Sequence, residues 1–134
     1  MPDPTLCTEQ EITGLVHQFY GRIRADETLG PIFEASVDDW DAHLVLLVDF
    51  WSSLLRGTRR FSGSPMTKHA ALPDLTADMF RRWLAIFHQC TAELDNTAMR
   101  NEVEAMAGRI ANKLWANYQG VHGTRHPGEP SPVQ

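Results

Sequence analysis

Two histidines, a tyrosine and a tryptophan are the side chains of this 134-residue chain that could perform chemistry together. His69 lies in the stretch Gly63–Leu72, in which Gly63 and Pro65 interrupt any regular helix. A histidine in such a connection can point inward without following the polar face of a helix. Taken alone it is most often a solvated or hydrogen-bonded residue, so its interest depends on what the flanking segments direct toward it.

Three further polar side chains, Tyr20, His43 and Trp83, fall on the hydrophobic stripes of predicted helices. A buried tyrosine hydroxyl or indole N–H needs a hydrogen-bond partner. A buried imidazole is costly unless the interior uses it. Each of the three, considered singly, also fits an ordinary core residue. Their joint presence on inner faces is what indicates a site.

The spacing of apolar residues predicts an all-α fold with four main helices, because no segment alternates with the period of a strand. Thr8 and Glu11 have the sequence pattern of a capping box, which predicts the start of the first helix. Its apolar stripe runs to Ile23. The pair Gly30-Pro31 cannot continue that helix, and Ile32-Phe33 is expected to return apolar bulk to the core in a non-helical corner.

Capping and breaking residues mark the limits of the other three predicted helices. The second starts with Asp38 or Asp39 as its N-cap and closes at Gly57; the third starts with Asp74 or Thr76 and runs to about Leu94; the fourth follows Asn96-Thr97 and stops at Gly120. A further short helical turn is expected around Pro65–Leu72, between the second and third helices.

Length and composition favour one ordinary globular domain, with 43% hydrophobic and 22% charged residues. We expect this domain to cover residues 1–119 and a disordered tail to cover 120–134.

The net charge of −5 argues against nucleic-acid binding. The longest aliphatic run, Leu44–Val48, is too short for a membrane span. The lack of an export signal and the isolated Cys7 and Cys90 favour a cytoplasmic protein.

Several kinds of catalytic site are excluded by missing motifs. The chain has no phosphate-binding glycine loop, no nucleophile elbow, and no pair of Glu-x-x-His motifs for a di-iron centre. A bare transition metal needs three or four converging ligands, whereas haem needs one axial imidazole and apolar walls. The predicted interior combines the four polar residues with the large aromatic side chains of Phe19, Phe33, Phe50 and Trp51. Such an interior suits haem better than a bare metal ion.

A set of short markers occurs in a specific order along the chain. They are Phe19-Tyr20, Leu29-Gly30-Pro31-Ile32-Phe33, His43 with Phe50-Trp51, Gly63-Ser64-Pro65 leading to Lys68-His69, and finally Trp83. With these markers the chain resembles the truncated haemoglobins and is most similar to group III. The resemblance covers roughly Glu9 to Tyr118. It implies a truncated globin-like two-over-two helical sandwich around haem, with the proximal helix reduced to a short piece.

The resemblance also implies roles for individual residues. His69 matches the family's proximal iron ligand, and Lys68 is its usual basic neighbour. Tyr20, His43 and Trp83 match the distal positions that face a bound gas molecule. Through these matches the resemblance implies haem b as the cofactor, with a five-coordinate iron.

The remaining haem-contacting positions come from the same resemblance and from the inner faces of the predicted helices. Leu47 is expected against the haem face and Phe33 against the ring at the corner. The other expected wall residues are Phe19, Phe50, Trp51, Met66, Phe87 and Ile110. The candidates to pair with the haem propionates are Arg59, Arg60, Thr67 and Lys68.

The function that this resemblance implies is the binding of O2, NO, CO or other small haem ligands in a polar distal pocket. Two donors near the ligand favour oxygen, nitric-oxide or peroxide chemistry over oxygen transport. Nitric-oxide dioxygenase or peroxidase-like turnover would need an unidentified reductase, because the chain has no flavin or nicotinamide motif. The alternative is a cofactor-free helical regulatory or adaptor domain, in which Tyr20, His43 and Trp83 are ordinary core residues.

Overall fold

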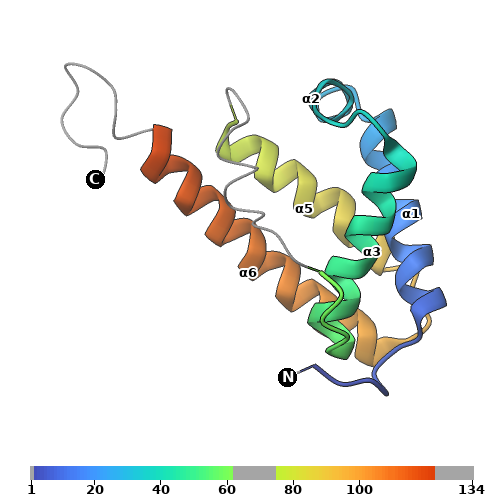
Figure 1. Ribbon diagram of the computed structural model, residues 1–134. Helices are drawn as coiled ribbons and strands as arrows, with labels where there is room; N and C mark the ends of the chain where they lie inside the picture. Colours follow the sequence, from blue (N-terminus) through green and yellow to red (C-terminus); the bar gives the residue numbers. More distant parts are fainter. Residues whose placement is uncertain (1, 62–74, 123–134) are drawn as a thin grey trace.

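The computed structural model describes residues 2–61 and 75–122 of the chain. These residues form five helices and no strand, which confirms the all-α prediction. The helices are α1 (Glu9–Ala25), α2 (Gly30–Ser36), α3 (Trp40–Arg56), α5 (Ala77–Thr91) and α6 (Thr97–His122). Figure 1 shows α5 and α6 running side by side, with α1 and α3 forming a second pair and α2 lying across its end.

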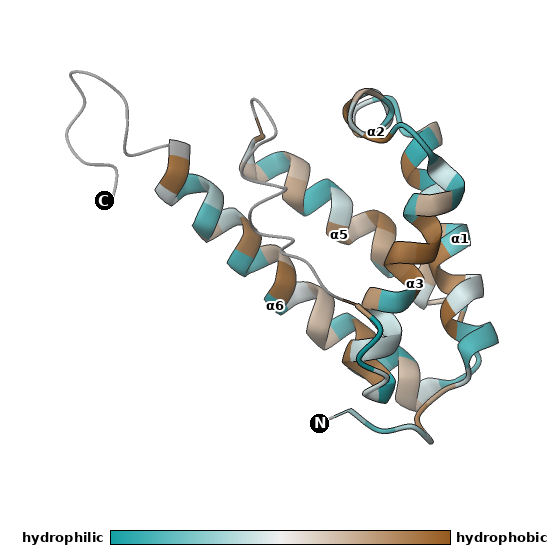
Figure 2. Ribbon diagram, viewed as in Figure 1, coloured by the Kyte–Doolittle hydropathy of each residue, from teal (hydrophilic) through white to brown (hydrophobic). Residues whose placement is uncertain are grey.

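Helix α1 is the centre of this arrangement, because α2, α3 and α5 all pack against it. Its start is the predicted capping box: the Glu11 N–H donates to Thr8 Oγ1 over 3.0 Å, and the Thr8 N–H donates to Glu11 Oε1 over 2.8 Å. The predicted stripe is buried, and its members are Ile12, Leu15, Val16, Phe19, Tyr20 and Ile23. Figure 2 shows hydrophobic turns on α3 and α5 where these helices approach α1.

The predicted non-helical corner at Ile32-Phe33 is wrong, since both residues belong to the short helix α2. Proline is tolerated in the first turn of a helix, where its missing N–H has no intrahelical partner, so Pro31 begins α2 instead of blocking it. Gly30 is needed here for space: a Cβ at this position would lie 2.5 Å from the carbonyl oxygen of Arg24. The absence of a side chain lets α2 pack directly on the end of α1.

The other helix limits are partly as predicted. Asp39 and Thr76 are the N-caps of α3 and α5, and Gly57 ends α3 with a left-handed φ of 74°. Two expected ends are wrong: α5 stops at Thr91 instead of Leu94, and α6 continues through Gly120 to His122. A glycine inside a helix costs only about 1 kcal/mol, which the surrounding turns of a long helix can offset.

Two sequence-based expectations lie wholly or partly outside the described residues. The helical turn around Pro65–Leu72 is one of them, and the tail beyond residue 122 is the other. Within the described residues, none of the helices combines the length and the apolar character required to cross a membrane.

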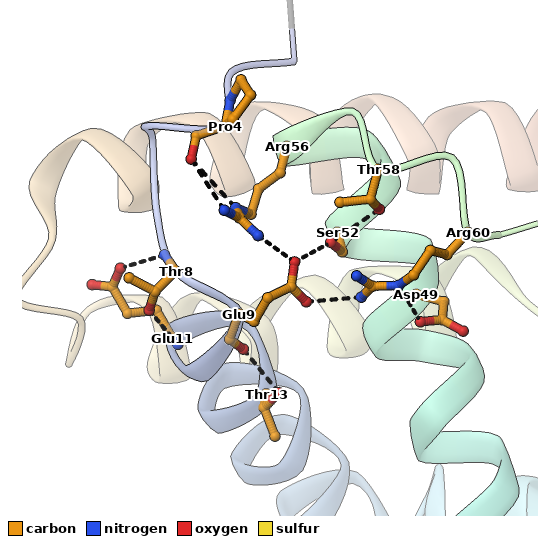
Figure 3. Close-up of polar contacts among 10 residues, drawn as sticks. All are labelled: Pro4, Thr8, Glu9, Glu11, Thr13, Asp49, Ser52, Arg56, Thr58 and Arg60. Atoms are coloured by element: carbon orange, nitrogen blue, oxygen red, sulfur yellow. Dashed lines mark hydrogen bonds and ion pairs between the residues drawn. The ribbon is translucent and has the colours of Figure 1, made fainter.

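A polar network joins the start of α1 to the end of α3 (Figure 3). The Glu9 carboxylate accepts hydrogen bonds from the buried Ser52 hydroxyl over 2.7 Å and from Arg60 Nη2 over 2.8 Å, and it also pairs with Arg56. Arg60 Nε donates to Asp49 over 2.9 Å. The hydrogen bonds from Arg60 and Ser52 lower the pKa of Glu9 from 4.5 to about 2. The network therefore fixes α3 against α1 as long as Glu9 is ionised.

The lowered pKa of Glu9 predicts a pH-dependent contribution to stability. Because the folded pKa lies below the unfolded value, the contribution is present above about pH 4.5 and is lost as the pH falls toward 2. Glu9→Gln should lower the free energy of unfolding by about 1 kcal/mol at pH 7, and by much less near pH 2. Urea unfolding at both pH values measures this, with the exposed Glu27→Gln as control. An equal loss at both pH values would contradict the prediction.

Candidate functional site

The helices border a half-open cavity of about 470 Å³. Side chains from all five described helices and from the connections between them line it. Its walls are mostly apolar. Eight of the residues that were predicted to face a ligand or to contact its cofactor line this cavity. These eight are Tyr20, Phe33, His43, Leu47, Phe50, Trp51, Trp83 and Ile110.

Two residues predicted to contact a cofactor lie behind the cavity wall instead. Phe19 and Phe87 are each 1% exposed and do not line the cavity. Phe87 stacks on Trp83 with ring centroids 5.6 Å apart and on Trp51 at 5.5 Å. Phe19 meets Tyr20, Trp83 and Phe87 edge to face, at centroid distances of 4.7, 5.2 and 5.0 Å. These two phenylalanines therefore support the residues that form the wall.

Tyr20, which is buried, and Trp83, which is partly buried, meet in the cavity wall. Tyr20 is only 6% exposed, and this burial raises the pKa of its hydroxyl well above the ordinary value of 10.0. A hydrogen bond from the Trp83 indole N–H offsets part of that rise. Tyr20 therefore stays protonated at neutral pH. Its oxygen accepts from Trp83, which leaves its own O–H available as a donor.

His43 stands beside this pair, on α3. Its ring centroid lies 6.3 Å from that of Tyr20, with the two rings at 89°. The imidazole is half-buried and borders the cavity. Three side chains that can hydrogen-bond, from three different helices, thus come together at the wall of an otherwise apolar space.

The basic residues predicted to pair with haem propionates lie elsewhere or outside the described residues. Arg60 is held by Glu9 and Asp49 in the network at the end of α3, and neither Arg59 nor Arg60 lines the cavity. Arg59 is exposed and has a left-handed φ of 61°. The other predicted haem contacts in this region, Met66, Thr67, Lys68 and His69, lie outside the described residues.

Sequence reasoning missed a second group of cavity residues. Leu46 and Met79 follow helical spacing and could have been found from their stripes, whereas Val37, Phe61 and Leu75 lie in connections, where periodicity carries no signal. The complete group is Leu29, Ile32, Ser36, Val37, Leu46, Phe61, Leu75, Met79, Phe80, Ala111 and Leu114.

The chemistry of the lining fits haem. Over residues 2–61 and 75–122 no three histidine, cysteine or acidic side chains come together as ligands for a bare metal ion. The lining supplies instead large apolar and aromatic surfaces for a flat ring, with hydrogen-bonding groups gathered around Tyr20. That combination is suited to a porphyrin, which brings its own four nitrogen ligands.

The position of Phe87 behind the wall predicts a stabilising role for its ring. Phe87→Leu should lower the free energy of unfolding by about 1.5–4.5 kcal/mol, because three aromatic pairs worth about 0.5–1.5 kcal/mol each are lost while leucine keeps most of the volume. Urea unfolding measures this loss. The exposed Val45→Ala serves as control and should change stability by less than about 0.5 kcal/mol. Equal stability of the two variants would contradict a supporting role.

Comparisons with known proteins agree with the fold. The family model described as bacterial-like globin matches residues 5–114. The group 3 truncated hemoglobin of Campylobacter jejuni is 31% identical over 108 residues, covering 78% of this chain and 85% of that protein. The crystal structure of the group III truncated hemoglobin from Campylobacter jejuni superposes with a TM-score of 0.76 at 30% identity, covering 85% of this chain and 92% of the other. The chain belongs to the bacterial-like globin family and is a truncated haemoglobin, which makes it a haem-binding protein.

Proposed function

We propose that the cavity holds haem b with His69 as the axial ligand of a five-coordinate iron, and that it retains small ligands for chemical use instead of transport. The observation that carries this proposal is the meeting of Tyr20, His43 and Trp83 at the wall of an apolar cavity. Apolar walls hold the ring by burial of its surface. Tyr20, oriented by Trp83, and His43 supply hydrogen bonds to a ligand bound beside it.

The described residues on either side of His69 support its role. Phe61 precedes the segment 62–74 and Leu75 follows it, and both line the cavity. Leu75 lies six positions after His69, a span of at most about 22 Å. The Leu75 N–H donates to the Tyr118 hydroxyl over 2.9 Å, which fastens Leu75 to α6. The chain therefore leaves the cavity wall at Phe61 and returns to it at Leu75, on either side of the proposed ligand.

Tyr20 is the donor to the ligand in this proposal, and Trp83 orients it. Haem would supply the iron that binds O2, NO or CO and exchanges electrons with it. The single N–H of Trp83 donates to the Tyr20 oxygen, which leaves the Tyr20 O–H to donate to a bound ligand. If this donor contributes about 1–2 kcal/mol to holding a ligand that gains negative charge, it slows the loss of the ligand by about 5- to 30-fold.

Such retention favours reaction of the held ligand over its release. We assign to this chain nitric-oxide dioxygenation or peroxidase-like turnover, with electrons supplied by a separate reductase. The buried thiols of Cys7 and Cys90 are both unpaired, which is compatible with work in the reducing cytoplasm. We place the end of the globin domain at His122, three residues beyond the predicted limit of residue 119, because α6 continues to that residue.

Replacement of His69 tests the axial ligand. His69→Ala should weaken or shift the Soret band of the full-length protein, because the iron loses its protein ligand. His17→Ala, a change at an exposed position on α1, is the control and should leave the spectrum unchanged. An unaltered Soret band in His69→Ala would refute the assignment. A wild-type chain that stays colourless with added haemin would instead favour the cofactor-free adaptor domain.

Replacement of Tyr20 tests ligand retention. Tyr20→Phe should raise the O2 dissociation rate by about 5- to 30-fold, because one donor worth about 1–2 kcal/mol is lost. Trp83→Phe should also raise it, since the Tyr20 hydroxyl loses the group that orients it. Trp115→Phe on α6 is the control, because Trp115 does not line the cavity. Stopped-flow ligand replacement measures the rates, and an unchanged rate in Tyr20→Phe would contradict the proposal.

A further inference from the structure

A cluster of three side chains lies next to the cavity without lining it. Arg24, Glu34 and Trp40 come from α1, α2 and α3 and meet at the junction of these helices. The Trp40 indole N–H donates to Glu34 Oε1 over 2.7 Å. Arg24 Nη2 lies 3.4 Å from Glu34 Oε2, and the Arg24 guanidinium sits 4.5 Å from the centre of the Trp40 ring. We call these three residues the tryptophan clamp.

The clamped indole touches the polar side chains of the cavity from behind. Its ring centroid is 5.5 Å from that of His43, edge to face at 89°, and 6.2 Å from that of Tyr20. His43 therefore stands between two aromatic rings, because Tyr20 meets it at 6.3 Å, also at 89°. A rotation of the imidazole about its side-chain bonds changes its contacts with both rings.

Trp40 is also the first residue of α3, and Asp39 is its N-cap. The first turn of a helix is held by fewer backbone hydrogen bonds than its middle. His43 lies only one turn further along. A bond from Trp40 across to α2 therefore restrains the part of α3 that carries the imidazole, and Arg24 and Glu34 hold the indole from its face and its edge.

We propose that Trp40 is the positioning residue for His43, and that the Arg24–Glu34 pair sets the orientation of the imidazole at the cavity by fixing Trp40. This inference rests on the proposed function, since it concerns a residue assigned to the ligand side of the haem. Trp40 itself does not touch the ligand. It acts through His43, and the surface pair acts through Trp40.

The test uses the full-length haem-loaded ferrous protein with bound CO, which is diamagnetic and suits NMR. Glu34→Ala removes the acceptor of the indole bond and the ion pair together while leaving Trp40 in place. Glu93→Ala is the matched control. Glu93 pairs with Arg22, which lies on α1 as Arg24 does, and its side chain is 53% exposed against 48% for Glu34. Glu34→Gln keeps an acceptor for the indole N–H and serves as the conservative variant.

The readouts are the side-chain NMR signals of His43 and the infrared stretching bands of bound CO. In Glu34→Ala we expect a second His43 orientation whose population rises by about three- to tenfold, as loss of one hydrogen bond implies. A second CO band should accompany it. Glu34→Gln and Glu93→Ala should keep the wild-type pattern. Wild-type-like spectra in Glu34→Ala would overturn the proposal.

Failure of the proposed function gives a different result. If the wild-type chain takes up no haem, it shows no Soret band, and the variants show none either. The His43 NMR signals of the haem-free wild-type chain and variants are then compared. A shift confined to Glu34→Ala supports the clamp even in that case. Identical His43 signals in Glu34→Ala and Glu93→Ala overturn it. Urea unfolding of each variant separates a local change at His43 from general destabilisation.

Discussion

The stacked rings of Trp51, Phe87 and Trp83 are the interaction on which the cavity depends. A space of about 470 Å³ inside a small helical protein gives up many packing contacts, and soft walls would close into it. Planar aromatic side chains resist this, because they have few rotamers and brace one another across helices. Phe87 lies between the two tryptophans, and Phe19 packs edge to face against the stack from α1.

Charges are kept at the edge of this aromatic interior. The Glu9 network closes the start of α1 against the end of α3, and the tryptophan clamp closes the junction of α1, α2 and α3. Both use partly exposed carboxylates, because a buried ion pair would incur a large desolvation cost. None of the described residues that line the cavity is an aspartate, glutamate, lysine or arginine. Arg60 illustrates the division: a residue expected beside haem instead holds two helices together outside it.

Neutral polar groups in an apolar wall also connect stability to ligand chemistry. Burial keeps the Tyr20 hydroxyl protonated, and the Trp83 N–H occupies its oxygen. In the proposed function, the same low-dielectric surroundings that cost folding energy would strengthen a hydrogen bond from Tyr20 to a ligand. His43 is less enclosed than Tyr20 and packs against the rings of Tyr20 and Trp40. The two residues therefore differ in how deeply the fold buries them.

The sequence by itself determined the all-α fold, the capped start of α1, two possible caps each for α3 and α5, and the inward faces that bear Tyr20, His43 and Trp83. These features follow from local hydrogen bonding and from a helical period that repeats along the chain. The sequence did not determine that Ile32 and Phe33 are helical, because Gly30 and Pro31 favour either a break or a helix start depending on what packs against them. Nor did it separate Phe87 behind the wall from Trp83 in the wall, since both lie on one inner face. Only tertiary structure decided those points, because the depth of a side chain and the partner of an arginine depend on residues distant in the chain.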